Sequence, residues 1–331
     1  MSQFLVIQTA FLGDAILGTA VLEELHTQYP NAQIDYLVRK GHESLFVGHP
    51  FIRHLLIWDK KNGKYKNLFK LLKRIRKQRY DKVINLQRFA STGFLTGFSR
   101  AKERIGFNKN PLSFLFTKSV HHTYTQHEVL RNNALVKAEN KEGKNGATGD
   151  PHPKLYPQQV HFDRVRQYQH EPYITIAPAS VWFTKQLPKQ KWVEFLNKIK
   201  EPMVVAIIGG TNDRALQEEI VSETKNDLVT FHRLCGELAL LETAALMKGA
   251  MLNYTNDSGP MHIASAMNAP TRAIFCSTVE EFGFGPLSDD HQVIQTPLEL
   301  DCRPCGLHGY MACPKGHFKC ALSIDLEPDF D

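Results

Sequence analysis

The amino-acid sequence predicts an α/β protein built from two doubly wound domains. Its 331 residues are enough for two domains of ordinary size. Short apolar runs typical of buried strands alternate with segments of helical spacing, and this alternation implies parallel sheets. The stretch 139–159 is rich in Gly, Pro, Asn and Lys and has no apolar period, so it is the predicted linker. We therefore place the domains at residues 1–150 and 151–331.

The first domain is predicted to begin with a strand at Phe4–Ile7, followed by a polar loop and a helix over 16–25. The loop has one glycine, Gly13, where G-x-G-x-x-G has three, so it does not support a dinucleotide-binding loop. Asp14 stands where this loop meets the helix, and an acid there can cap the first turn. Further strands are predicted at 31–38, 55–58 and 82–87.

A strongly basic helix is predicted before the last of these strands. Eleven Lys and Arg residues lie from Lys60 to Lys82, against one acid. Helical spacing places Tyr65, Leu68, Phe69, Leu72 and Ile75 on one apolar face. Another face carries what we call the basic stripe, which is Lys66, Lys70, Lys73 and Lys77. The stripe is either a solvated helix face or a surface drawn to an anionic membrane, at roughly 1 kcal/mol per charge.

Composition and charge exclude several classes of protein. Hydrophobic content of 42% and charged content of 22% are typical of a globular chain. No apolar run approaches 18 residues, and the first residues lack a signal-peptide pattern, so we expect a cytoplasmic protein. Residues 1–150 hold 24 Lys and Arg against 12 Asp and Glu, which favours an anionic partner for this half. Known nucleic-acid motifs are absent, so nucleic acid is not the predicted partner.

The second domain is predicted to open with a strand at Tyr173–Ile176 and a loop that ends near Lys185. A lone loop lysine is usually solvated. A second strand, Met203–Ile208, ends in two glycines that allow either close approach of a ligand or a plain turn before Asp213. A third short strand is predicted at 250–254.

The most informative stretch follows this third strand, at 256–266. Asp257 or Ser258 can cap a helix, Gly259 permits close approach of a ligand, and Pro260 is favoured in a first helical turn. The stretch therefore stands outside the carboxyl end of a strand, where α/β proteins bind ligands. Free backbone N–H groups at such a helix start suit a phosphate. The alternative is an ordinary capped helix.

The six cysteines fall into two groups. Cys235 and Cys276 are isolated and are predicted to be core residues. The other four follow the spacing C-x2-C-x7-C-x6-C, which indicates either a structural zinc site or free thiols. These four are Cys302, Cys305, Cys313 and Cys320.

The run Asn256–His262, with Ala264 and Ala266, resembles the signature of glycosyltransferase family 9, the heptosyltransferases of the lipopolysaccharide inner core. The resemblance extends from Gly13-Asp14 to the cysteine-rich tail. It implies two Rossmann-like domains facing a cleft, the GT-B architecture, with the acceptor bound by the first domain and the nucleotide sugar by the second. It also implies inverting transfer of a heptose from ADP-heptose to a lipopolysaccharide core acceptor, with no cofactor required for catalysis.

The resemblance assigns roles residue by residue. Asp14 is the expected general base, and Lys185 the expected partner of the donor diphosphate. The other donor-binding residues implied are Ser180, Thr184, Asp213, Asp257, Ser258, Gly259, Pro260 and His262. The acceptor-binding residues that the resemblance implies are Gly13, Arg88 and Arg104. Many relatives carry a glycine at position 88 and a lysine at position 91, where this chain has Arg88 and Ser91, so acceptor recognition is expected to differ.

The resemblance also bears on location and on the end of the chain. Because lipopolysaccharide precursors are anionic, it favours the membrane interpretation of the basic stripe, on the cytoplasmic face of the inner membrane. Pro328 disfavours the long terminal helix usual in this architecture. Two alternatives stay open. A nucleotide-sugar 2-epimerase would leave the basic first half unexplained, and in a non-catalytic nucleotide-sugar or nucleic-acid binding protein Asp14 would be only a cap.

Overall fold

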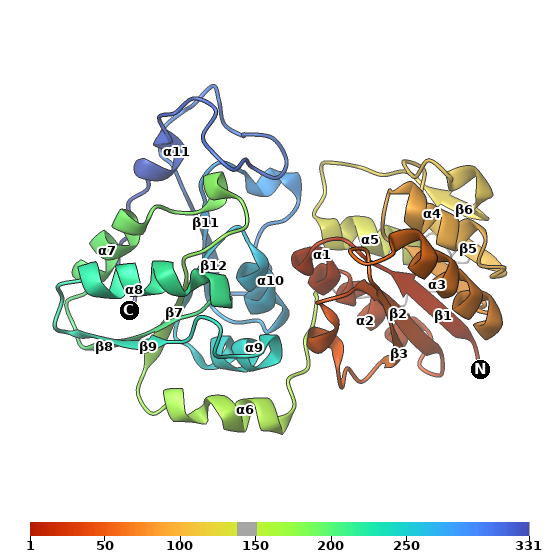
Figure 1. Cartoon of the computed structure of the whole chain (residues 1–331), viewed down its shortest axis with the longest axis horizontal. Helices are drawn as coiled ribbons and strands as arrows, with labels where there is room; N and C mark the ends of the chain where they lie inside the picture. The colour runs from red at the N-terminus through yellow and green to blue at the C-terminus, as the bar shows by residue number, and fades with distance from the viewer. Residues whose placement is uncertain (138–150, 331) are drawn as a thin grey trace. The chain divides into compact units, whose positions relative to one another are not determined.

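The computed structural model describes residues 1–137 and 151–330 (Figure 1). The chain forms two compact units, Met1–Tyr156 and Pro157–Asp331. The predicted boundary at Asp150 and most of the predicted linker lie outside the described residues. Residues 151–156 belong to the first unit. Here the Lys154 N–H donates to Thr19 Oγ1 and the Tyr156 hydroxyl donates to Glu23.

The first unit is built on one parallel sheet of six strands, in the order β3-β2-β1-β4-β5-β6. The order reverses between β1 and β4, as in a Rossmann fold. The strands are β1 (Gln3–Ile7), β2 (Gln33–Arg39), β3 (Ile52–Trp58), β4 (Lys82–Asn85), β5 (Glu103–Phe107) and β6 (Lys118–Val120).

The helices around this sheet include two packed pairs, α2 with α5 and α3 with α4. Their bounds are α1 (Leu12–Leu17), α2 (Thr19–Gln28), α3 (Lys64–Gln78), α4 (Ala90–Gly97) and α5 (Glu128–Lys137). Short 3-10 turns lie at η1 (Glu43–Phe46) and η2 (Ser113–Leu115). The core beneath α3 joins Leu5, Ile7 and Leu37 of the sheet to Leu72 and Ile75 of the helix.

The apolar face predicted for α3 is partly wrong. Leu68, Leu71, Leu72 and Ile75 are buried, as a core-facing stripe requires. Tyr65 and Phe69, however, are 69% and 60% exposed. At 100° per residue these two side chains fall between the buried stripe and the basic stripe. Two exposed aromatic rings therefore border the lysines.

The second unit repeats the same topology with a second parallel sheet, in the order β12-β11-β10-β7-β8-β9. Its order reverses between β7 and β10. The strands are β7 (Tyr173–Ala177), β8 (Met203–Ile207), β9 (Val229–Arg233), β10 (Asn253–Asn256), β11 (Thr271–Phe275) and β12 (His291–Gln295). The strand predicted at 250–254 is thus β10, which begins later and runs into the signature.

The helices of this unit also pack in groups, with α6 against α9, α9 against α10, and α7 against α8. They are α6 (Gln159–Val165), α7 (Lys189–Asn197), α8 (Arg214–Glu223), α9 (Leu240–Gly249), α10 (Gly259–Ala266) and α11 (Lys319–Leu322). Its 3-10 turns are η3 (Arg166–Tyr168), η4 (Phe183–Lys185), η5 (Thr211–Asp213) and η6 (Glu280–Phe282). Among the helices that the structure describes, none has the length and hydropathy of a membrane-spanning segment.

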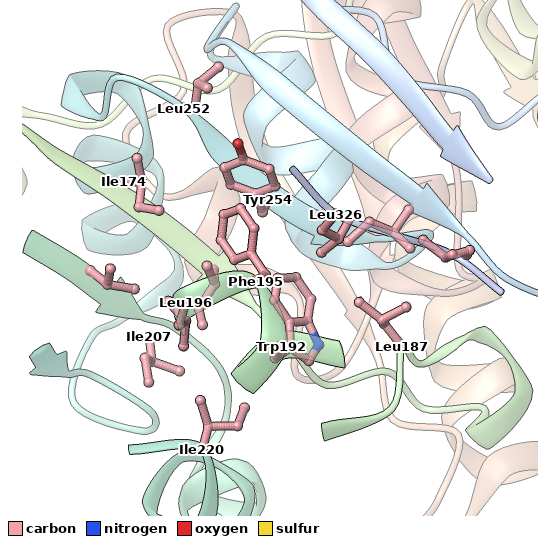
Figure 2. Close-up of a cluster of buried hydrophobic side chains, with 14 of the residues drawn as sticks. Ile174, Leu187, Trp192, Phe195, Leu196, Ile207, Ile220, Leu252, Tyr254 and Leu326 are labelled. Atoms are coloured by element: carbon pink, nitrogen blue, oxygen red, sulfur yellow. The ribbon is translucent and has the colours of Figure 1, made fainter. Parts of the chain in front are cut away.

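The core of the second unit is centred on Trp192, Phe195 and Tyr254, which are fully buried (Figure 2). The end of the chain contributes to it, since Ile324 and Leu326 pack into the same cluster. After α11 the described residues form no further helix, in agreement with the expectation from Pro328.

Candidate functional site

The reversal of strand order in each sheet gathers several predicted residues. Ligands of doubly wound sheets bind outside the carboxyl ends of the strands, where the order reverses. In the first unit Asp14 follows β1 and Arg88 follows β4. In the second unit Lys185 follows β7 and Asp257 follows β10. The topology therefore places these four residues in the connections that follow the strands on either side of each reversal, where ligands of doubly wound sheets bind.

Lys185 and Asp257 form a partly buried ion pair. Lys185 Nζ lies 2.6 Å from Asp257 Oδ2, and the two side chains are 14% and 7% exposed. The Thr278 hydroxyl donates to the same carboxylate oxygen at 2.6 Å. Charges removed from water to this extent require a partner, and each supplies one for the other. An ammonium has three N–H donors, so the pair leaves donors for a ligand anion.

Asn256 holds the loop that carries Lys185. Its side-chain Nδ2 donates to the carbonyls of Ala177 and Pro178, at 3.2 and 2.8 Å, where the loop begins. Its Oδ1 accepts the N–H of Leu187 at 2.9 Å, where the loop ends. The buried amide thus ties both ends of the loop to β10. The sequence contained this asparagine in the signature but did not indicate its role.

The start of α10 offers donors beside this ion pair. Ser258 is the N-cap residue, yet its side chain makes no capping hydrogen bond. Its Oγ is buried and has no hydrogen-bond partner among the described residues. Gly259 and Pro260 begin the first helical turn, and His262 is buried. A hydroxyl and backbone N–H groups are therefore available to a phosphate.

The other residues predicted to bind the nucleotide sugar make hydrogen bonds within the protein. Thr184 is 1% exposed, and its Oγ1 accepts hydrogen bonds from the Ser277 hydroxyl and the Tyr310 N–H. Asp213 Oδ2 accepts the Gly210 N–H at 2.7 Å and so caps η5 at the end of β8. The N–H of Ser180 donates to Gln186 within the Lys185 loop.

In the first unit Asp14 does cap its own helix. Its Oδ2 accepts the Phe11 N–H at 3.2 Å, and Gly13 precedes it in the first turn of α1. Asp14 is half-buried. Its carboxylate also raises the pKa of the buried Tyr36 hydroxyl, after the larger effect of burial. Capping and a role as a base do not exclude one another, because a carboxylate has two oxygens.

A buried charge pair lies within electrostatic range of Asp14 and Arg88. Glu128 Oε2 lies 2.9 Å from Arg131 Nη2 on α5. Burial raises the pKa of Glu128 to about 7, opposed by Arg131 and by Arg88 and reinforced by the charge of Asp14. Arg88 itself donates to the Tyr124 hydroxyl. Asp14 and Arg88 are therefore brought together with a carboxyl and a guanidinium that were not assigned from the sequence.

Arg104 is not brought beside Asp14. It lies near the amino end of β5, in register with Val83 of β4. Its guanidinium donates to the backbone carbonyls of Leu115 and Ala101, at 3.0 and 2.7 Å. This arginine holds local chain segments together, near the amino end of its strand, whereas Asp14 and Arg88 follow the carboxyl ends of theirs.

Lys60 lies at the same edge of the first sheet. Its Nζ donates to the backbone carbonyl of Thr9, in the loop after β1, at 2.6 Å and lies 4.7 Å from the centre of the Trp58 ring. Burial lowers the pKa of Lys60 to about 8, and the charges of Arg39 and Lys64 act in the same direction.

The structure does not support the predicted zinc site. All six cysteines are free thiols, and no group of three metal-binding side chains occurs among the described residues, which include all four tail cysteines. The Cys305 thiol donates to the Cys302 carbonyl, and Cys320 is buried in the core of the second unit. Cys235 and Cys276 are buried core residues, as predicted.

Comparison with known proteins gives one family. A model described as glycosyltransferase family 9 (heptosyltransferase) matches residues 68–308. Lipooligosaccharide heptosyltransferase 2 of Haemophilus influenzae is 24% identical over 311 residues, 88% of each chain. Lipopolysaccharide heptosyltransferase 3 of Escherichia coli K12 is 27% identical over 289 residues, 82% of this chain and 81% of that protein.

Solved structures show the same fold. E. coli ADP-heptose LPS heptosyltransferase II superposes with a TM-score of 0.76 at 22% identity, over 92% of this chain and 96% of that one. E. coli heptosyltransferase WaaC with ADP gives a TM-score of 0.73 at 16% identity, over 89% and 93%. The two-domain GT-B fold expected from the sequence is thereby confirmed.

Proposed function

Because this chain belongs to glycosyltransferase family 9, the heptosyltransferase family, it is a glycosyltransferase, and we propose that it transfers a heptose from ADP-heptose to a lipopolysaccharide core acceptor. The observation that carries the proposal is the Lys185–Asp257 ion pair at the β7/β10 reversal, beside the start of α10. Support for the donor comes from the relative WaaC, whose structures contain ADP and ADP-2-deoxy-2-fluoro heptose.

The second unit would bind the nucleotide sugar. Negative charge on the diphosphate increases as the sugar leaves. The Lys185 ammonium, the Ser258 hydroxyl and the N–H groups at the start of α10 are placed to stabilise that charge. Asp257 orients Lys185 through the 2.6 Å contact. In this proposal Lys185 acts on the diphosphate and Asp257 acts through Lys185.

The first unit would bind the acceptor and activate it. Asp14 removes the proton of the acceptor hydroxyl, whose oxygen then attacks the anomeric carbon as the bond from that carbon to the diphosphate breaks. Attack on the face opposite the departing ADP inverts the anomeric centre. Arg88 and Arg131 provide positive charge near Asp14 for an acidic acceptor. The exposed position of Arg88 suits direct contact with that acceptor.

The proposed acceptor is attached to a lipid, and we propose that the basic stripe meets the anionic cytoplasmic face of the inner membrane. All four stripe lysines lie on α3, away from its buried leucines. Exposed Tyr65 and Phe69 border them. Basic residues with adjoining aromatic rings favour the interfacial zone of a bilayer.

The test is to incubate the protein with ADP-heptose, with and without a core acceptor, and to measure released ADP and the sugar products. ADP release that depends on the acceptor supports transfer. An isomerised sugar without acceptor indicates an epimerase, and no reaction indicates a binding protein. Replacing Lys185 by Ala should weaken ADP binding and slow transfer, whereas Lys191→Ala, at an ion pair on α7, should change neither. Unchanged ADP affinity and turnover in Lys185→Ala would refute the phosphate assignment.

A further inference from the structure

We infer that the tail segment Arg303–Tyr310 forms part of the donor site and positions Lys185. This inference rests on the proposed function, because the role of Lys185 comes from there. It concerns a segment that contains Cys305, one of the four candidate metal cysteines, and that the proposed reaction does not use. The segment is hydrogen-bonded to the Lys185 loop, to Ser277 and Thr278 beside Asp257, and to the end of β11.

The first tie is a pair of hydrogen bonds to the residue before Lys185. The Thr184 N–H donates to the Tyr310 carbonyl at 3.1 Å. In return, the Tyr310 N–H donates to Thr184 Oγ1 at 2.8 Å. Both bonds involve the backbone of Tyr310, so the path of the tail sets them. They fix the turn η4, at whose end Lys185 stands.

The second tie reaches the other partner of the ion pair. The Ser277 hydroxyl donates to Thr184 Oγ1 at 3.0 Å, and the Ser277 carbonyl accepts the Cys305 N–H at 2.8 Å. The next residue, Thr278, donates to Asp257. The tail is thus connected to the lysine through Thr184 and to the carboxylate through Ser277 and Thr278.

Arg303 anchors the segment at its other end. Its guanidinium donates to the carbonyls of Cys276 and Thr278, both at 2.8 Å, and to Phe275 at 3.2 Å. These carbonyls lie where β11 ends, at the edge of the sheet that carries the site. A planar guanidinium with several fixed donors suits such a cluster of carbonyls. The tail is therefore fastened to the sheet itself.

Gly309 shows how closely the tail approaches Lys185. Its φ is +74°, and a Cβ placed there would lie 2.8 Å from Thr184 Oγ1 and 3.1 Å from Lys185 Cγ. Any side chain at 309 must therefore displace the turn or the stem of the lysine. Gly316, in the same tail, has a φ of +70°, but a Cβ there would meet nothing within 4 Å. The chain thus contains a matched pair of left-handed glycines, only one of which touches the site.

The physical benefit of this arrangement is preorganisation. A lysine has a long flexible stem, and a cation held in place before the reaction stabilises developing charge without further reorganisation. Asp257 fixes the head of Lys185, and the Gly309–Tyr310 backbone fixes its turn and lies against its stem. The tail therefore acts on the diphosphate through Lys185, as a positioning element.

The experiment compares Gly309→Ala with Gly316→Ala in the full-length protein. Both place alanine in a left-handed conformation, so both should lower the melting temperature, and Gly309→Ala should lower it further because its Cβ also clashes with the turn. Only Gly309→Ala should weaken ADP binding and lower kcat, by about tenfold to a hundredfold, as expected for a misplaced catalytic group. KM for the acceptor should stay the same in both. Equal ADP affinity and kcat in the two variants would overturn the inference.

A second pair of variants decides the matter if Gly309→Ala does not fold. Thr184→Ser keeps the hydroxyl that accepts the Tyr310 N–H, and should retain ADP binding. Thr184→Val removes that acceptor and should reproduce the Gly309→Ala loss. Equal ADP binding in these two would also overturn the inference. If Lys185→Ala leaves ADP binding and turnover unchanged, the role proposed for Lys185 in the proposed function has failed. If Lys185→Ala weakens ADP binding, but the two glycine variants bind ADP equally and the two Thr184 variants do so as well, the tail inference alone has failed.

Discussion

Asn256 and Asp257 are neighbours in the chain, yet they hold the Lys185 loop by different means. Asn256 bonds to backbone groups at both ends of the loop, whereas Asp257 balances the lysine charge at 2.6 Å. A buried amide that loses its partners costs about 1–3 kcal/mol. Asn256 is therefore expected to matter for the shape of the loop, and Asp257 for the position and charge of the lysine head.

For Asp14, the replacement by Asn separates its two roles. The Asn side chain keeps an oxygen that can accept the Phe11 N–H, so the start of α1 should remain capped. It cannot take a proton, so turnover should fall by at least about a hundredfold. ADP binding, measured by calorimetry, should be unchanged, because the groups proposed to bind ADP lie in the second unit. Nearly normal turnover in this variant would leave Asp14 with the capping role alone.

The raised pKa of Glu128 predicts that the stability of the protein depends on pH. Its pKa is about 7 in the folded protein, above the ordinary carboxyl value of 4.5. The folded state therefore holds this proton to higher pH than the unfolded state, and stability is lost as pH rises from 4.5 to 7. Between pH 4.5 and 7 the free energy of unfolding of the wild type should therefore fall by up to about 3 kcal/mol more than that of Glu128→Gln. Urea denaturation at pH 5 and pH 8 measures this, and parallel pH profiles would contradict it.

Single residues of the site were accessible to sequence reasoning only where a motif named them. The motifs name Asp14, Lys185 and Asp257, and the structure places them in the connections that follow β1, β7 and β10. Glu128 was not assigned a role, because its meaning depends on burial and on Arg131. The partners of Asn256 lie 69 to 79 residues away, and no local pattern indicates such contacts.

Among the helices, α3 carries the clearest test of an interaction with lipid. Changing Lys66, Lys70, Lys73 and Lys77 to Gln should weaken binding to anionic vesicles by several kcal/mol at most, at about 1 kcal/mol per charge. The difference should shrink as salt rises, because the Debye length falls below about 8 Å. Vesicle sedimentation over a series of salt concentrations measures this. Turnover on a short delipidated acceptor should change little.

The matched control for this experiment changes the same four lysines to Arg, which keeps the charge. These two variants separate charge from side-chain identity, and Tyr65→Ser with Phe69→Ser removes the two aromatic rings without changing charge. Vesicle binding at low salt that is equal in the Gln variant and the wild type would mean that α3 presents only a solvated face.

Whole elements were predicted where their period was clear and missed where tertiary contacts decide. The buried leucines of α3 follow helical spacing, whereas Tyr65 and Phe69 lie at the edge of that stripe and are exposed. Phe69 instead packs edge-to-face on Phe94 of α4, with ring centres 5.7 Å apart. The tail has no apolar period, and its bond to Thr184 spans 126 residues. Its cysteines suggested a metal, while its structural role lies in its backbone.

The two units repeat one strand order, and each carries its candidate residues where that order reverses. Alternation of strands and helices predicted the parallel sheets, because parallel strands need crossovers. It did not predict that β10 pairs with β7 rather than with β9, since pairing across the sheet is a non-local choice.

Binding of ADP should be visible as protection confined to the second unit. At a hundredfold excess over its dissociation constant, a ligand stabilises the state that binds it by about 2.7 kcal/mol. Hydrogen exchange with ADP should therefore slow in 178–187, 256–262 and 303–310. Residues 1–137 should exchange as in the free protein. Protection that appeared only in the first unit would contradict the assignment of the donor site.

The environment of Lys60 makes this side chain a nucleophile as well as a cation. With a pKa of about 8, roughly half of its amines are neutral at pH 8, against under roughly one per cent for an ordinary lysine. Acylating reagents attack the neutral amine, so a limiting dose should modify Lys60 before the exposed lysines of α3, with a yield that rises steeply between pH 7 and 9. Peptide mass spectrometry measures the order of labelling. The loop after β1 thus lies against a chemically addressable group, at which a fluorophore or crosslinker can be attached without introducing a cysteine.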